Sequence, residues 1–246
     1  MKKKRFFHQL VFIFLMMFGQ LVYGQVQGAA DEVENLYTHT EQVYSTDDLL
    51  VNGQIYIPLH PKAKGDPYFG ENRFTEGSVS IKGRQYSGLL LKYNIENQRL
   101  ILLTTVESGK YVSLLLNSNL VDAFAIGGLH FVHVGNFVQN LEPSGYFAEV
   151  YAGNFLFLIK YEKKFKAVYN NQERNGSYTK MQTSYFVFED GEFRNITKKK
   201  ALLNYFSLHK KEINTFMRKH KIRYKKAGVE ALNQLMKYCD SVSTNR

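Results

Sequence analysis

Short apolar runs alternate with turn residues along most of this chain, which is the pattern of antiparallel strands joined by hairpins. The runs are rich in residues that favour strands, and dipeptides such as Lys82-Gly83 and Gly127-Gly128 separate them. With a hairpin near Ile55, we count about eleven strands. The pattern predicts a mainly β fold with C-terminal helices (α+β), in which an antiparallel meander forms a rolled sheet, a sandwich or a barrel. The other predicted strands cover residues 78–81, 85–93, 100–106, 111–116, 123–126, 129–134, 147–151, 155–161, 185–188 and 193–196.

The segment around Asn52-Gly53 predicts the first hairpin and a loop after it. Residues 49–51 are apolar, and Ile55 and Ile57 alternate with polar residues after the dipeptide. We therefore expect two strands joined by a tight type I′ turn. Residues 62–77 are rich in Gly, Pro, Asp, Asn and charge, which indicates a long exposed loop. Loops of this length often carry function.

The spacing of apolar residues changes to three and four after Thr197, which is typical of helices. Thr197 is a candidate cap for the first of them. Each helical run places its apolar residues on one face, so we expect three amphipathic helices that pack on the sheet or on one another. The three stripes are Leu202, Leu203 and Phe206, then Ile213, Phe216 and Met217, then Val229, Leu232, Met236 and Cys239.

The N-terminus has the composition of an export signal. Residues 2–5, Lys-Lys-Lys-Arg, precede the apolar run 6–18, and Gly24 suits cleavage before Gln25. The apolar run is too short to span a bilayer stably, and an uncleaved anchor is the alternative. The single cysteine, Cys239, is far from the cleavage point and cannot carry a lipid there. We expect an exported protein, periplasmic or extracellular, that does not span a membrane after cleavage.

These patterns divide the chain into four segments. They are a signal peptide (1–24), a polar lead-in (25–48), an antiparallel β domain (49–196) and a basic helical tail (197–246).

Positive charge is concentrated in the last of these segments. The 246 residues include 32 Lys and Arg and 22 Asp and Glu, for a formal net charge of +10. Residues 25–192 hold 14 basic and 19 acidic residues, a net charge of −5, whereas residues 193–246 hold 14 and 3, a net charge of +11. This asymmetry indicates either a surface for an anionic partner or a basic segment docked on an acidic domain. The candidate anionic-partner surface comprises Lys210, Lys211, Arg218, Lys219, Lys221, Arg223, Lys225 and Lys226.

Residues with catalytic or metal-binding chemistry are sparse. His130 and His133 are three residues apart on a predicted strand, so they point to opposite faces and do not share a metal easily. Cys239 lies on an apolar helical stripe, which predicts a buried, inert thiol. The Gly-x-Ser-x-Gly elbow is absent, and the glycines follow hairpin turns rather than a phosphate-binding loop. We therefore predict no catalytic, cofactor-binding or metal-binding residues and no cofactor.

A set of segments carries a resemblance to a known group. They are residues 83–94, 145–150, 160–163, 184–186 and 210–222. Their order resembles a large, poorly characterised group of secreted β-rich proteins with a basic helical C-terminal tail from Gram-negative bacteria. The resemblance covers most of the chain after the leader and includes no catalytic signature. It implies an exported β domain with a basic tail and carries over no active-site residues.

Two functions follow as hypotheses. The first is an exported, non-enzymatic binding or interaction protein of the bacterial envelope, whose partner is an anionic envelope component or another exported protein. Export makes nucleic acid an unexpected partner. The alternative is a hydrolase of an envelope polymer, in which a loop carboxylate such as Asp66 or Glu71 faces another acid across a groove.

Overall fold

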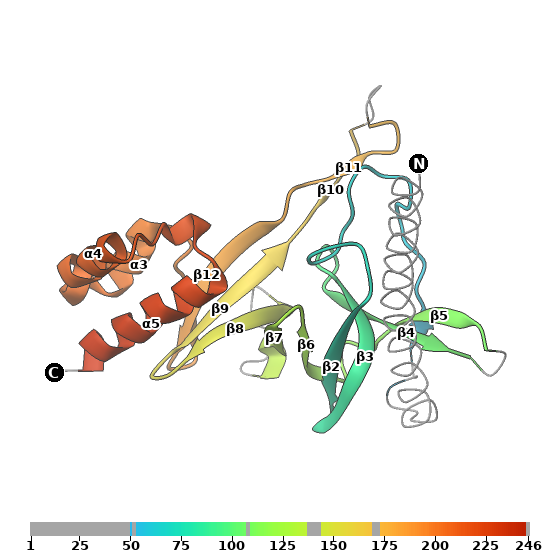
Figure 1. Ribbon diagram of the computed structural model, residues 1–246, viewed down its shortest axis with the longest axis horizontal. Coiled ribbons are helices and arrows are strands. Elements are labelled where there is room, and N and C mark those ends of the chain that lie inside the picture. Colours follow the sequence, from blue (N-terminus) through green and yellow to red (C-terminus); the bar gives the residue numbers. More distant parts are fainter. Residues whose placement is uncertain (1–49, 51–52, 107–108, 137–143, 169–172, 245–246) are drawn as a thin grey trace, which may run out of the picture. The chain divides into compact units, whose positions relative to one another are not determined.

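The computed structural model describes residues 50, 53–106, 109–136, 144–168 and 173–244. The predicted signal peptide and polar lead-in, residues 1–24 and 25–48, lie outside them. The described residues form one 11-stranded antiparallel sheet followed by helices (Figure 1), which confirms the expected mainly β fold with C-terminal helices. Sheet and helices belong to one compact unit, residues 47–246.

The strands of the sheet mostly pair with their neighbours in sequence. The spatial order is β1-β5-β4-β3-β2-β6-β7-β8-β9-β12-β13, so one meander runs from β2 to β5, and β6 returns to pair with β2 before a second meander begins. Because β1 and β13 are its two edges, the 11-stranded sheet is open and does not close on itself. The strands are β1 (Gln54–Ile55), β2 (Thr75–Ile81), β3 (Arg84–Asn94), β4 (Arg99–Thr105), β5 (Tyr111–Leu115), β6 (Val121–Ile126), β7 (Leu129–His133), β8 (Tyr146–Ala152), β9 (Leu156–Glu162), β12 (Gln182–Glu189) and β13 (Glu192–Asn195).

The first predicted hairpin is wrong. Ile55 pairs with Leu114 of β5 rather than with the residues before Asn52, and Leu50 is buried and helical. The pairing continues past β1, since the Tyr56 N–H donates to the Ser113 carbonyl at 2.8 Å. The physical reason is that β5 offers a free edge of the sheet, a partner that the local sequence cannot reveal. Residues 49, 51 and 52 lie outside the described residues.

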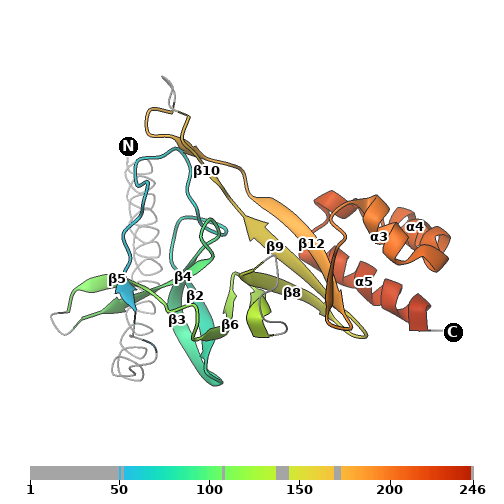
Figure 2. The same cartoon turned by 180° about the vertical axis from the view of Figure 1, so that it is seen from behind.

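The segment expected as a long exposed loop is only partly exposed. Its last residues form the start of β2 at Thr75, and Tyr68 within it is buried. Tyr68 forms a bridge with Asn94 of β3, and Lys64 forms one with Ser177. Ser177 belongs to a small two-stranded ribbon, β10 (Phe165–Lys166) with β11 (Ser177–Tyr178), which the sequence pattern did not reveal. Figure 2 shows this ribbon beyond the ends of β9 and β12.

The sheet has a core on both faces, because successive side chains of a strand point to opposite sides. Tyr146 on β8 belongs to an aromatic cluster with Tyr93, Phe124 and Phe131, whose ring centroids lie 4.8–6.1 Å apart. Its neighbour Phe147 belongs to a second cluster on the other face. The other buried members of that second cluster are Val132, Val134, Leu158 and Phe186. Burial on both faces explains the continuous apolar runs of the central strands.

The three predicted helices are present in the tail. They are α3 (Lys199–Tyr205), α4 (Lys210–Lys219) and α5 (Val229–Thr244), with 3-10 turns η2 (Ser207–His209) and η3 (Tyr224–Lys226) between them and a further turn, η1 (Val134–Asn136), in the β region. The predicted cap is wrong: α3 follows Lys198, whose side chain makes no cap bond. The Thr197 hydroxyl instead accepts a hydrogen bond from the Tyr185 N–H at 2.9 Å, which fastens the chain to β12.

Candidate functional site: a basic helical surface and a cleft

The tail is anchored to the sheet by a carboxylate on α5. Asp240 is 7 % exposed, and it accepts hydrogen bonds from the Tyr151 hydroxyl at 2.6 Å, the Asn154 N–H at 3.0 Å and the Asn154 side-chain amide at 2.7 Å. Burial and the bond to Asp240 raise the pKa of Tyr151 to about 12. Gly153 leaves room for this arrangement, because a Cβ there would collide with Asp240 and Tyr151. The contact joins α5 to the turn between β8 and β9.

Further contacts hold the tail along its length. The Tyr224 hydroxyl of η3 donates to the Ile196 carbonyl at 2.9 Å, and the ring of Tyr224 packs against Tyr185 of β12 at 5.2 Å between centroids. The side-chain amide of Asn233 on α5 donates to the Val150 carbonyl of β8. In both views α5 lies beside β8 and β9, and it contacts β8. The tail therefore packs against the sheet along its length and is not attached to it by the chain connection alone.

Three of the four residues of the predicted apolar stripe of α5 are buried, and Val229 is partly exposed. Leu232, Met236 and Cys239 are at most 1 % exposed. Burial raises the pKa of the Cys239 thiol from 9.0 to about 12. The prediction of a buried thiol at this position is confirmed, and a protonated, inaccessible thiol is a poor nucleophile.

All eight residues of the predicted anionic-partner surface are exposed. On α4, Lys211 and Arg218 are seven residues apart, so they lie two turns apart on one line, away from buried Ile213 and Met217. The acid of this helix, Glu212, is 2.8 Å from His209. Among the described residues, none of the eight cations forms an ion pair. The surface continues over η3, and three further exposed lysines, 198–200, precede it in the chain.

The histidines and the candidate hydrolytic carboxylates each have their own surroundings in the structure. His130 is exposed, whereas His133 is partly buried and its Nδ1 accepts a bond from the Gly135 N–H at 3.1 Å; burial lowers the pKa of His133. Asp66 pairs with Lys163 at 3.0 Å, and Glu71 is an exposed partner of Arg73. The described residues contain no cluster of three or more His, Cys, Asp or Glu side chains that could hold a metal ion.

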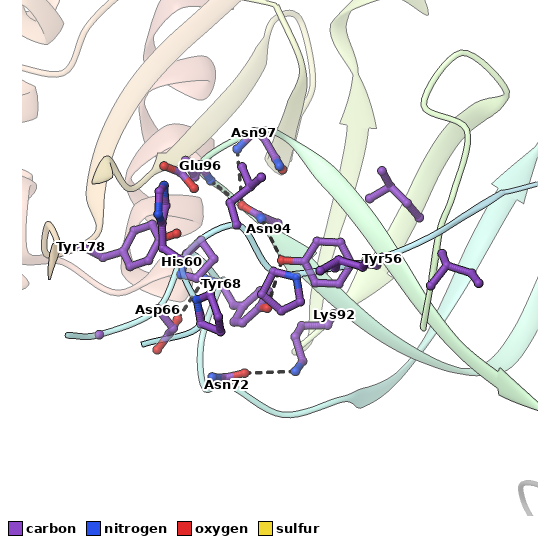
Figure 3. Close-up of a pocket in the computed structure, with 18 residues that line it drawn as sticks. Tyr56, His60, Asp66, Tyr68, Asn72, Lys92, Asn94, Glu96, Asn97 and Tyr178 are labelled. Atoms are coloured by element: carbon purple, nitrogen blue, oxygen red, sulfur yellow. Dashed lines mark hydrogen bonds between the residues drawn. The ribbon is translucent and has the colours of Figure 1, made fainter. Parts of the chain in front are cut away.

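A cleft at the other end of the described sheet contains Asp66 together with residues that the sequence did not mark as candidate site residues. It has a volume of about 460 Å³ and is lined by the segment after β1, the loop before β2, the end of β3 and β11 (Figure 3). The Tyr56 and Tyr68 hydroxyls are 3.1 Å apart, and the Asn94 side-chain amide reaches Tyr56 at 3.4 Å. Only the loop 62–77 gave a sequence signal here. Residues 55–72 meet residues 92–97, Leu115 and Tyr178 at this cleft, so no local pattern could have located it.

One wall of the cleft carries a partly buried cation. The Lys92 ammonium donates to the Asn72 side-chain oxygen at 3.0 Å and lies over the rings of Tyr68 and Phe74, at 4.6 and 4.4 Å from their centroids. Burial lowers the pKa of Lys92, although Asp66 opposes the shift. No carboxylate of the described residues lies within ion-pair distance of it.

The rim of the cleft is apolar and exposed. Ile55, Ile57 and Leu59 are 68, 76 and 74 % exposed, and all three line the cleft. Near Tyr178, the ring of His60 stacks on Phe165 with centroids 3.6 Å apart. The cleft thus combines a polar floor with an aliphatic rim.

Comparison of the chain with protein-family models, curated proteins and solved structures gave no match. The resemblance to secreted β-rich proteins stays a prediction. Among the described helices, none combines the length and apolar character needed to cross a membrane.

Proposed function

We propose that this chain is an exported, non-enzymatic binding protein of the bacterial envelope, and that the basic surface of its helical tail binds an anionic envelope component. The exposure of all eight candidate cations, without an ion pair among the described residues, is the observation that carries the proposal. Each Lys or Arg near an anionic surface contributes about 1 kcal/mol of attraction. The docked tail supports this role, because it presents the cations from fixed helices instead of a loose segment.

Vesicle binding tests the proposal. The purified chain should bind phosphatidylglycerol-containing vesicles in preference to phosphatidylcholine vesicles at low salt. We expect the apparent affinity to fall at least roughly tenfold between about 50 and 500 mM NaCl, because salt screens exposed charges. Co-sedimentation at a series of salt concentrations measures both effects.

A matched pair of triple variants locates the binding surface. Substitution of Lys211, Arg218 and Lys219 by Gln should weaken binding at least roughly tenfold. The control substitutes the exposed residues Lys82, Lys110 and Lys180 by Gln, which removes the same charge from the β region and should change binding far less. Equal losses in the two variants, or binding that high salt does not weaken, would contradict the proposal.

The hydrolase alternative stays a prediction. Asp66 and Glu96 both line the cleft, but Asp66 pairs with Lys163 and Glu96 is hydrogen-bonded to Tyr178. Glu71 does not line the cleft and pairs with Arg73. Hydrolysis of a glycosidic polymer by a carboxylate pair requires two such groups that face each other across the substrate.

A further inference from the structure

We propose that the cleft formed by the segment after β1, the loop before β2 and the end of β3 binds a small amphiphilic carboxylate. Its anionic group would pair with Lys92, and its apolar part would lie against Ile55, Ile57 and Leu59. This site is separate from the basic surface of the tail, and it does not depend on the function proposed for that surface.

Among the described residues, no carboxylate lies within ion-pair distance of the cation on the cleft wall. Lys92 is partly buried, so its ammonium has lost part of its hydration, while its contacts are one amide oxygen and two aromatic faces. A desolvated charge without a counter-charge is costly. A ligand carboxylate would supply the missing charge and a charge-assisted hydrogen bond.

The floor of the cleft also has one phenolic hydrogen-bond donor without an acceptor among the described residues. Tyr56 and Tyr68 share one hydrogen bond, so one of their two phenolic protons remains without an acceptor among the described residues. The Asn94 amide donates toward Tyr56 and adds no acceptor to the pair. Burial raises the pKa of Tyr68, which keeps its phenol protonated. An acceptor-bearing ligand group satisfies this donor.

The carboxylates of the cleft are already engaged. Asp66 is neutralised by Lys163 at 3.0 Å and also accepts the Tyr68 N–H at 2.9 Å. Glu96 is hydrogen-bonded to Tyr178, which contributes to the raised pKa of that phenol. Figure 3 shows Glu96 and Tyr178 on the opposite side of the cleft from Lys92. The end of the cleft that holds Lys92 is therefore the part suited to an anion.

The rim fits the apolar part of such a ligand. Three large aliphatic side chains, each more than two-thirds exposed, occur within five residues and line the same cleft. A volume of about 460 Å³ falls within the range of small-molecule sites, which is about 300 to 1,000 Å³. Burial of aliphatic surface on such a ligand contributes about 25 cal/mol per Å² of apolar area removed from water.

Calorimetric titration with three probes of equal chain length tests the proposal. Octanoate should bind the full-length protein with a dissociation constant below about 1 mM, and 1-octanol and octyltrimethylammonium should bind at least roughly tenfold more weakly. Equal affinity for the three probes, or no octanoate binding, would overturn the proposal.

Variants separate the two halves of the site. Lys92→Met should weaken octanoate binding at least roughly tenfold and leave 1-octanol binding unchanged. Ile57→Asn, at an exposed position, should weaken both probes by several-fold. Lys82→Met removes an exposed cation outside the cleft and should change neither. Octanoate affinity that Lys92→Met leaves intact would contradict the assigned role of Lys92. Vesicle binding by the tail variants is a separate readout, so each proposal can fail alone.

Discussion

Among single residues, Asp240 makes the most extensive hydrogen-bonded contact between the tail and the sheet. Its two carboxylate oxygens face three donors from β8 and the following turn. An asparagine would place an NH₂ group against one of these donors. Asp240 therefore has a structural role that the charge pattern did not predict, since in the sequence it is only one of three acids in a basic segment.

We predict that Asp240→Asn lowers the free energy of unfolding by about 2–4 kcal/mol, because it breaks a buried, charge-assisted network. Gly153→Ala should also destabilise the protein, since its Cβ would collide with Asp240 and Tyr151. Urea unfolding followed by circular dichroism measures both. Asp190→Asn, on the exposed β12–β13 turn, is the matched control and should stay within about 0.5 kcal/mol of the wild type. An Asp240→Asn protein as stable as this control would show that the anchor is not needed.

At the level of the helices, the burial of Cys239 on α5 makes the free energy of unfolding fall at alkaline pH. The Cys239 thiol has a pKa of about 12 in the folded protein, against 9.0 for an ordinary thiol. Between these values the folded state holds a proton that the unfolded state has lost. The stabilisation is therefore complete below pH 9 and declines as pH rises toward 12.

We predict that the free energy of unfolding falls by about 1 kcal/mol between pH 8 and pH 10 through this thiol. In Cys239→Ala that part of the decline should be absent, although the variant starts from a lower stability because it leaves a small cavity. Denaturant unfolding at a series of pH values gives, for the wild type and for Cys239→Ala, the slope of the free energy of unfolding against pH. Identical slopes in the two proteins would refute the assignment to Cys239.

The elements differ in how well the sequence predicts them. The ten strands expected from residue 78 to residue 196 all occur, with boundaries shifted by a few residues, because period-two alternation and turn glycines are local signals. The apolar faces of α3, α4 and α5 were predictable for the same reason. The pairing of β1 with β5 and of β2 with β6 was not, because each joins segments separated by other strands.

In the described structure as a whole, the basic surface of the tail and the cleft lie in different parts. The basic surface was predictable from composition, since exposed lysines on an amphipathic helix need no long-range information. The cleft was not, because Tyr56, Tyr68, Lys92 and Tyr178 come together only after the sheet and the β10–β11 ribbon have formed. We therefore propose an electrostatic contact for the tail and a small-molecule site for the cleft.

Lysine footprinting on anionic vesicles tests whether the protein contacts an anionic surface through its helical tail. The protein is acetylated briefly with and without phosphatidylglycerol-containing vesicles, and modification of each lysine is measured by mass spectrometry. We predict at least several-fold protection by vesicles of Lys210, Lys211, Lys219, Lys221, Lys225 and Lys226, while Lys82 and Lys110 react as before. Protection of the β-region lysines with the tail lysines unchanged would contradict this prediction.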